Sequence, residues 1–266
     1  MDEIKVSSKE RFKIAKDMLL RYSGCSERDI GKYILLTNFT KYLDVFSQGI
    51  AVKVKEGSLL KVAIDKKNDI TMIQFNIGAP SAALVVDLLS SIFPRAVLML
   101  GLCGGLHKSL KIGEFILPLA AIRNEGVSKH YMPPEVPSLP TFKIQSILAN
   151  TLKNKKSPYK TGVIHTTDYR FWEFDKKFRD ELKLQKAIAI EMECSALFTT
   201  AFKMKVPIGA LLLVSDLPLT IEGIKTYALQ QKVFKTHVSS HIALGLEAMD
   251  NIKKFGQDID LRHFQW

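Results

Sequence analysis

The stretch Ala96-Val-Leu-Met-Leu-Gly-Leu-Cys-Gly-Gly105 is the part of the sequence that decides the fold. Its first five residues are all apolar and do not alternate with polar ones, which is typical of a strand buried on both faces. Glycines follow at once, and they allow the backbone to turn sharply and a flat ligand to approach closely. By itself such a turn is a weak sign of function. No Gly-Lys-Ser/Thr follows it, so the segment is not a phosphate-binding P-loop.

Short apolar runs alternate with helical patterns on both sides of this stretch. Further strands are predicted at 33–37, 51–55, 59–64, 70–75, 114–121, 161–165, 187–190 and 208–214. Helices are predicted at 8–22, with Ser7 or Ser8 as the cap, and at 41–47, 79–92, 192–204 and 227–253. This alternation indicates an α/β fold, a three-layer α/β/α sandwich with a central, mostly parallel mixed sheet. Ligands of such sheets bind beyond the carboxyl ends of the strands.

Composition and length favour one globular domain. Hydrophobic residues make up 47% of the 266 residues and charged residues 24%, which argues against disorder. No repeat or linker divides the chain, so 1–266 is interpreted as one domain with an N-terminal helical extension at 1–30. No apolar run approaches the roughly 18 residues that span a bilayer, and the charged N-terminus lacks the apolar segment of a signal peptide. We therefore expect a cytoplasmic protein with no membrane partner.

The net charge of +11 raises the question of an anionic partner. Lysines occur singly and in pairs on stretches interpreted as exposed helix ends and loops, without a dense basic tail or an RNA-binding aromatic motif. This distribution favours a solvated surface over nucleic-acid binding. The three cysteines, Cys25, Cys103 and Cys194, are far apart and have no His-rich neighbour, so neither a disulfide framework nor a metal site is predicted.

Acidic residues stand at the carboxyl ends of two predicted strands. Glu191 and Glu193 lie at a strand-to-helix junction, and Asp216 ends the apolar run Leu213-Val-Ser-Asp216. One interpretation is structural, because negative charge favours a helix N-terminus and an aspartate can cap the next helix. The other is functional, because ligands bind at this edge of a parallel sheet. The residues alone leave both interpretations open.

Four segments, taken in order, resemble the motifs of the nucleoside phosphorylase/nucleosidase superfamily. They are Gly78-Ala-Pro-Ser81, Gly101-Leu-Cys-Gly-Gly105, Glu191-Met-Glu193 and Ser215-Asp216. The resemblance covers nearly the whole chain from Tyr33 onward and implies a nucleoside phosphorylase-like version of the predicted sandwich. Within the superfamily, further segments resemble the AMP nucleosidase family in its short form: 33–39, 166–173, 214–218 and 222–225.

The resemblance implies an activity and an assembly. We expect an enzyme that hydrolyses the N-glycosidic bond of AMP to adenine and ribose 5-phosphate, with AMP as the small-molecule partner and no cofactor. It also implies a homohexamer or another homo-oligomer, in which a neighbouring subunit often completes the site. The in-class alternative is a purine or uridine nucleoside phosphorylase or a methylthioadenosine-type nucleosidase. The alternative from another class is a non-catalytic basic protein that binds nucleic acid.

Matching to the superfamily motifs gives individual residues expected roles. Asp216 would protonate N7 of the departing purine, which requires a raised pKa that burial would supply. Glu193 would accept hydrogen bonds from the ribose hydroxyls, and Met192 would form an apolar floor under the sugar. Cys103 and Gly104 would border the substrate at the glycine turn.

Two departures from the phosphorylase pattern favour water as the nucleophile. Superfamily phosphorylases keep a Gly-Asp-Pro turn where this chain has Thr37-Asn38-Phe39, and an arginine where it has Met99. Leu102 stands where those enzymes have a serine. An orthophosphate pocket without its arginine and serine is poorly equipped to hold a dianion. Asn38 is kept as a substrate-binding candidate at this turn.

The remaining candidates concern the 5′-phosphate, the base and the water. Lys41, Arg123, Arg170 and Lys225 are the cations considered for the phosphate, although each type is more often a surface residue. Trp172 or Phe171 would stack on the purine, with a place in the core as the competing interpretation. Glu125, in a loop at a strand end, is considered as a base that orients the attacking water.

Overall fold

Nine strands form one sheet in the computed structural model, which describes residues 8–255. The strands are β1 (Tyr33–Thr37), β2 (Lys55–Glu56), β3 (Lys61–Asp65), β4 (Ile70–Gln74), β5 (Ala96–Gly105), β6 (Phe115–Asn124), β7 (Tyr159–Thr167), β8 (Ala189–Glu191) and β9 (Ile208–Asp216). Their order in the sheet is β2-β3-β4-β1-β5-β8-β7-β6-β9. Parallel pairs dominate the centre, and antiparallel pairs lie at β2–β3, β3–β4, β5–β8 and β6–β9.

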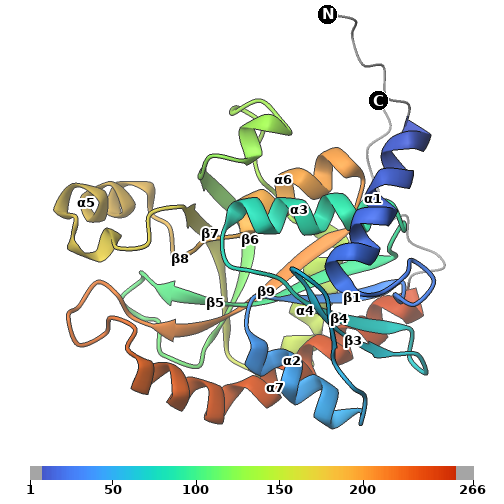
Figure 1. Ribbon diagram of the computed structural model, residues 1–266. Helices are drawn as coiled ribbons and strands as arrows, with labels where there is room; N and C mark the ends of the chain where they lie inside the picture. The colour runs from blue at the N-terminus through green and yellow to red at the C-terminus, as the bar shows by residue number, and fades with distance from the viewer. Residues whose placement is uncertain (1–7, 256–266) are drawn as a thin grey trace, which may run out of the picture.

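Helices cover both faces of this sheet, as Figure 1 shows. One layer contains α1 (Ser8–Ser23), α3 (Ala79–Ser90) and α6 (Cys194–Met204), and the other contains α2 (Thr40–Gly49), α4 (Phe142–Asn154) and α7 (Tyr227–Phe255). A further helix, α5 (Lys176–Gln185), lies to one side with the short 3-10 helix η2 (Trp172–Phe174), and a second one, η1 (Ser128–His130), follows β6. The predicted three-layer arrangement with a mostly parallel sheet is confirmed.

Strand β5, which carries the opening stretch, is the centre of the molecule. It is buried along its whole length and pairs in parallel with β1 on one side and β9 on the other. Val97 and Met99 face the core under α3 and α6, whereas Leu98 and Leu100 face the core under α2, α4 and α7. Each side of the strand thus contributes to a separate hydrophobic core, which is why the sequence shows no polar alternation.

The sheet closes on itself in its second half, which the sequence does not predict. Strand β5 pairs with both β8 and β9, and the chain of pairs β8–β7–β6–β9 completes a ring. The register shifts between Cys103 and Gly104 in β5 and between Pro118 and Ala120 in β6. Irregularities of this kind bend a strand and increase its twist, so they allow the closure.

Several boundaries differ from the prediction. Helices α4 and α5 are additional, and of the predicted strand at 51–55 only Lys55 belongs to a strand, because the preceding residues turn after α2. Ser7, one of the two cap candidates, lies outside the described residues, and helix α1 begins at Ser8. Cys25, Cys103 and Cys194 are free and buried. Within residues 8–255 no helix combines the length and the apolar character that crossing a bilayer requires.

Candidate active site

The carboxyl ends of β1, β5, β7, β8 and β9 surround one pocket, where a parallel sheet is expected to bind its ligand. Including its open mouth, the pocket holds about 590 Å³ of space. Its lining comprises Asn38, Phe39, Ile77, Leu102, Cys103, Gly104, Thr167, Tyr169, Arg170, Trp172, Glu173, Ile190, Glu191, Met192, Glu193, Ser215, Asp216, Pro218 and Lys225.

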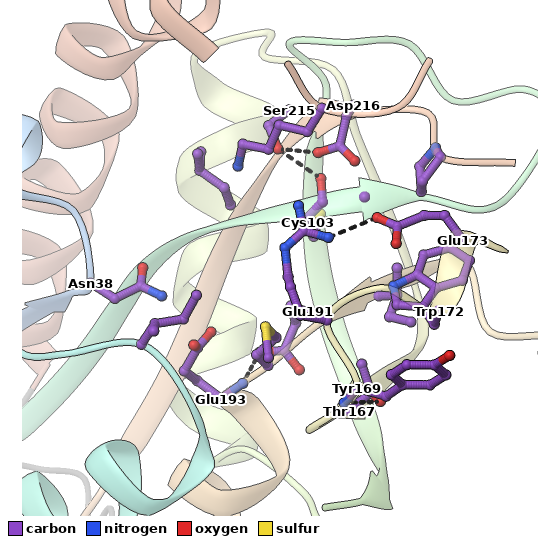
Figure 2. A pocket seen from close by; sticks show the side chains of 18 of the residues that line it. Asn38, Cys103, Thr167, Tyr169, Trp172, Glu173, Glu191, Glu193, Ser215 and Asp216 are labelled. Carbon is purple, nitrogen blue, oxygen red and sulfur yellow. Dashed lines mark hydrogen bonds and ion pairs between the residues drawn. The ribbon is translucent and has the colours of Figure 1, made fainter. Parts of the chain in front are cut away.

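Glu193 stands directly before helix α6 and points into the pocket (Figure 2). Its Oε1 accepts a hydrogen bond of 2.8 Å from the backbone N–H of Gly78, which adopts a φ of 101° that favours glycine. The side-chain amide of Asn38 lies near this carboxylate and favours its charged form. Burial raises the pKa of Glu193, and the neighbouring carboxylate of Glu191 raises it further. A buried, basic carboxylate is thereby held at the centre of the pocket.

Glu191, two residues earlier, has a different task. Its Oε2 accepts hydrogen bonds of 2.7 Å from the backbone N–H groups of Glu193 and Cys194, and its Oε1 accepts one from the Thr166 hydroxyl. These bonds satisfy N–H groups at the start of α6 and place a carboxylate at the positive end of the helix. Of the two interpretations of these acids, the structural one therefore applies to Glu191, which binds the N-terminus of α6. The side chain of Glu193 faces the pocket.

Asp216 ends β9 at the other side of the pocket and is only 7% exposed. Its Oδ1 accepts a hydrogen bond of 2.6 Å from the Ser215 hydroxyl. Burial raises the pKa of Asp216, and this bond, together with the positive charges of Lys225 and Arg170, opposes the rise. A Cβ atom added to Gly104 would lie 2.8 Å from Pro218 Cγ and 3.2 Å from Asp216 Oδ2, so glycine allows Pro218 and the acid to pack closely against this strand.

Two cations line the same pocket. Arg170 donates to Glu173 Oε1 at 2.8 Å, and its side chain is 47% exposed. The Lys225 ammonium lies 5.3 Å from the centre of the Phe39 ring and, within residues 8–255, forms no ion pair. Burial lowers the pKa of Lys225, whereas the charge of Asp216 raises it. Both side chains belong to a region that offers positive charge to a ligand.

The structure brings most of the predicted residues together. Asp216, Glu193, Met192, Cys103, Gly104, Asn38, Arg170, Trp172 and Lys225 all line the pocket. Trp172 is 4% exposed and packs on Phe178, so the core interpretation and the pocket interpretation both apply to it. Phe171, its alternative, is 67% exposed and is not part of the lining.

Three predicted ligands are not brought to the pocket. Lys41 is exposed on the first turn of α2. The Arg123 guanidinium is occupied by Ser128 Oγ and by the carbonyl oxygens of Met132, Pro133 and Val136, so it fixes the loop 128–136.

Glu125 is the third of these ligands. It accepts bonds from the backbone N–H groups of Val127 and Ser128 and from the Ser195 hydroxyl. These partners tie its loop to helix α6, and Glu125 takes no part in the lining.

Sequence reasoning missed several lining residues, of which Glu173 is the most polar. Its side chain is 4% exposed, and Oε2 is buried without a hydrogen-bond partner among the described residues. Thr167 ends β7, Tyr169 follows that strand by two residues, and Ile77 lies just before α3. The signal that could have found Glu173 is its place in the segment 166–173, where Arg170 precedes it by three residues. Within residues 8–255 no cluster of three His, Cys, Asp or Glu side chains is arranged to hold a metal.

Comparisons with known proteins show the family and the fold. A family model described as the Phosphorylase superfamily matches residues 36–248. The AMP nucleosidase of Escherichia coli (strain K12) is 27% identical over 92% of this chain and 60% of its own length, so the chain spans about 60% of that relative. The crystal structure of AMP nucleosidase from Bacteroides thetaiotaomicron is 36% identical, with a TM-score of 0.83 over 93% of this chain and 100% of that one. A uridine phosphorylase from Vibrio fischeri, at 21% identity and a TM-score of 0.75 over 90% and 98%, shares the fold.

Proposed function

The chain belongs to the phosphorylase superfamily, and we propose that it hydrolyses the N-glycosidic bond of AMP, releasing adenine and ribose 5-phosphate. The observation that carries the proposal is the composition of one pocket. It joins a buried acid, Asp216, to a buried carboxylate, Glu193, and to the cations Lys225 and Arg170. Similarity to the AMP nucleosidases of E. coli and B. thetaiotaomicron supports the choice of nucleotide.

The leaving base requires a proton donor. Asp216 is proposed to protonate N7 of adenine while the electron pair of the C1′–N9 bond departs with the base. Because burial raises the pKa of Asp216, the carboxyl group keeps its proton closer to neutral pH than an exposed aspartate would. Gly104 and Asp216 line the same pocket, where the base is proposed to lie.

The ribose requires orientation and a counter-charge. Glu193 is proposed to accept hydrogen bonds from the ribose hydroxyls above Met192, which forms the apolar floor. Such charge-assisted bonds are stronger than neutral ones, and the carboxylate stabilises the positive charge that develops on the sugar. The bond from the backbone N–H of Gly78 fixes the direction of Glu193 before the substrate arrives.

Lys225 and Arg170 are proposed to hold the 5′-phosphate. Partly buried cations without a full set of partners favour an anionic ligand, and guanidinium and ammonium groups both bind phosphate. The place of the missing orthophosphate arginine is taken by Met99, which is 1% exposed and packs in the core. Water is therefore proposed as the nucleophile.

One assay tests the function. Adenine release is measured from AMP, adenosine and methylthioadenosine, with and without orthophosphate. We expect release from AMP without orthophosphate, at a much higher kcat/KM than from adenosine. Strict dependence on orthophosphate would overturn the hydrolase, and equal kcat/KM values for AMP and adenosine would overturn recognition of the phosphate.

Variants assign the phosphate contacts. Lys225→Met and Arg170→Met are each expected to lower kcat/KM for AMP about 10–100-fold, because a hydrogen bond to a charged group contributes about 1.5–3 kcal/mol. Their effect on adenosine should be small. Lys41→Met, on the exposed turn of α2, serves as the control for loss of one positive charge. Equal losses for AMP and adenosine would place both cations elsewhere in the reaction.

A homo-oligomer, with the hexamer as the expected form, is also part of the proposal. Exposed aromatic side chains lie on the segment after β7 that lines the pocket: Tyr169 is 45% exposed, Phe171 67% and Phe174 75%. Exposed apolar groups of this size favour burial against another subunit. Light scattering at assay concentration measures the assembly, and a monomer would contradict it.

A further inference from the structure

The side-chain oxygen of Asn38 is buried and has no hydrogen-bond partner among the described residues. Asn38 directly follows β1 and lines the pocket, and its amide lies near the carboxylate of Glu193 and favours the charged form of that group. Oδ1 is therefore a free acceptor inside the site. A buried acceptor without a donor costs about 1–3 kcal/mol, so a ligand that donates a hydrogen bond here is favoured.

Asn38 lies on the opposite side of the pocket from Asp216. It extends from the end of β1 and Asp216 from the end of β9, and these strands flank β5 on its two sides. Figure 2 shows Asn38 and Glu193 together at one end, with Asp216 and Glu173 at the other. If the base departs at the Asp216 end, a nucleophile that enters opposite to it approaches C1′ from the end where Asn38 lies.

Two hydrogen-bond acceptors meet at this end of the pocket. They are Asn38 Oδ1 and the carboxylate of Glu193, which Figure 2 shows at the same end. A water molecule has two hydrogens to donate and would keep a lone pair directed at C1′ when both are engaged. An orthophosphate dianion offers mainly acceptor oxygens, which these two groups would not bind. The donor pattern therefore matches water.

We propose that Asn38 orients the attacking water and that Glu193 receives its proton. The inference rests on the proposed hydrolysis of AMP. The water oxygen forms a bond to C1′ while the C1′–N9 bond breaks and its electron pair leaves with adenine. Asp216 delivers its proton to N7 of the base, and one water proton passes to the Glu193 carboxylate. The products are adenine and ribose 5-phosphate, and the enzyme regains its starting state when a proton moves from Glu193 to Asp216 through solvent.

Replacement of the amide tests this role. Asn38→Ala is expected to lower kcat for AMP hydrolysis about 10²-fold, the size of effect that misplacing a reacting group produces, while KM changes only a few-fold. Lys41→Ala is the matched control, because Lys41 is three residues further along the chain and exposed. A large rise in KM with unchanged kcat would overturn the inference and assign Asn38 to substrate binding alone.

Competition between water and methanol as nucleophiles gives a second measurement, which would not change if Asn38 had only a structural role. In water with added methanol, the ratio of methyl riboside 5-phosphate to ribose 5-phosphate reports which nucleophile is held at C1′. Removal of the amide opens space and removes the acceptor, so Asn38→Ala is expected to raise this ratio several-fold over wild type and Lys41→Ala. An unchanged ratio overturns the inference.

A second variant preserves the size of the side chain. Asn38→Asp keeps an acceptor for water but adds a negative charge beside Glu193, which raises the pKa of that carboxyl group. The acidic limb of the kcat profile should therefore move to higher pH, with the methanol ratio close to wild type. An unshifted limb contradicts the contact between Asn38 and Glu193 on which the inference depends.

The two proposals fail in different ways. A wild-type enzyme that releases no adenine from AMP without orthophosphate overturns the proposed function, and this inference with it. A wild-type enzyme that hydrolyses AMP, together with Asn38→Ala that keeps its kcat and methanol ratio, overturns this inference alone. Thermal unfolding of each variant identifies any loss of activity that comes from loss of folded protein.

Discussion

Asp216 is an acid whose surroundings oppose its ionisation. The residue is 7% exposed at the end of an apolar strand, and desolvation is the largest cause of its raised pKa. Asp216→Asn keeps the shape of the side chain but removes the proton that would go to N7. We expect kcat/KM for AMP to fall about 10²–10⁴-fold, the usual contribution of a general acid. Activity close to wild type would exclude Asp216 as the donor.

A second variant, at the hydroxyl of Ser215, tests the same role of Asp216. The bond from Ser215 Oγ favours the charged form of Asp216 and so lowers its pKa. Ser215→Ala should therefore raise that pKa. Because the acid acts in its protonated form, the alkaline limb of the kcat/KM profile should move to higher pH, which a pH–rate series measures. A limb that moves to lower pH, or does not move, contradicts the assignment.

The sequence predicts those residues of the candidate site whose place in the fold depends on their position just after a strand. Asp216 ends β9 and Glu193 follows the end of β8 by two residues, and strands of a parallel sheet bring such positions together. For Arg123, position along the chain is not sufficient to predict its place. It also stands in a strand near that edge, but its partners are carbonyl oxygens of residues 132–136, and only the folded loop reveals them.

The start of helix α6 depends on one carboxylate. Glu191 accepts two backbone N–H bonds and the Thr166 hydroxyl, so Glu191→Ala leaves these donors unpaired in a buried place. Each unpaired donor costs about 1–3 kcal/mol, and we expect the free energy of unfolding to fall by at least that amount. Urea denaturation at pH 7 measures the loss. Unchanged stability would contradict the capping role.

Glu191→Gln separates charge from hydrogen bonding. The amide oxygen still accepts the backbone bonds, but the negative charge that raises the pKa of Glu193 is gone. That pKa should fall, and the acidic limb of the kcat profile should move to lower pH. Glu181→Gln, on the exposed face of α5, is the control for loss of one remote acid.

Elements were predictable where the hydrophobic pattern was strong. The buried strands β1, β5 and β9 lie within one or two residues of their expected starts. Helix α4 carries a usable signal, since Ile144, Ile147, Leu148, Thr151 and Leu152 are buried at helical spacing. Helix α5 carries almost none, because only Leu182 is buried and the rest of the helix is solvated. Its cap, Asp175 to the N–H of Phe178, is too common a pattern to identify it alone.

At the scale of the whole molecule, closure of the sheet brings strands that are far apart in the sequence to one pocket. Strand β5 contacts β1, β8 and β9, so residues that follow all four strands face one pocket. The apolar pattern predicts a sheet but gives no information on whether its edges meet, because strand pairing depends on irregularities such as the shift at Cys103. This is why the layers could be predicted and the ring could not.

A buried histidine links helix α7 to helix α2 and to strand β9 of the sheet. His241 of α7 is 0% exposed, and its Nδ1 accepts the hydrogen bond of the Tyr42 hydroxyl of α2 at 2.8 Å, while Nε2–H donates to the Leu211 carbonyl oxygen of β9 at 3.0 Å. Both ring nitrogens are used by the neutral imidazole, and desolvation lowers the pKa of His241 to about 3.

This histidine makes stability depend on pH. The unfolded chain binds a proton below the ordinary pKa of 6.5, whereas the folded protein resists it until about 3. The unfolded state therefore gains protons as pH falls through this window, and the stabilisation present above pH 6.5 is lost at up to about 1.4 kcal/mol per pH unit. Urea unfolding of wild type at pH 7.5 and pH 5 should show this fall.

A paired replacement isolates the contribution. Tyr42→Phe with His241→Phe removes the titrating group and the hydroxyl that depends on it, and should lose less stability than wild type between pH 7.5 and pH 5. His130→Gln, at an exposed histidine, should keep the wild-type difference. Because carboxyl groups contribute equally to all three proteins, the difference between them reports His241 alone. The same fall in the double variant as in wild type would show that the buried imidazole is not the group whose protonation destabilises the fold.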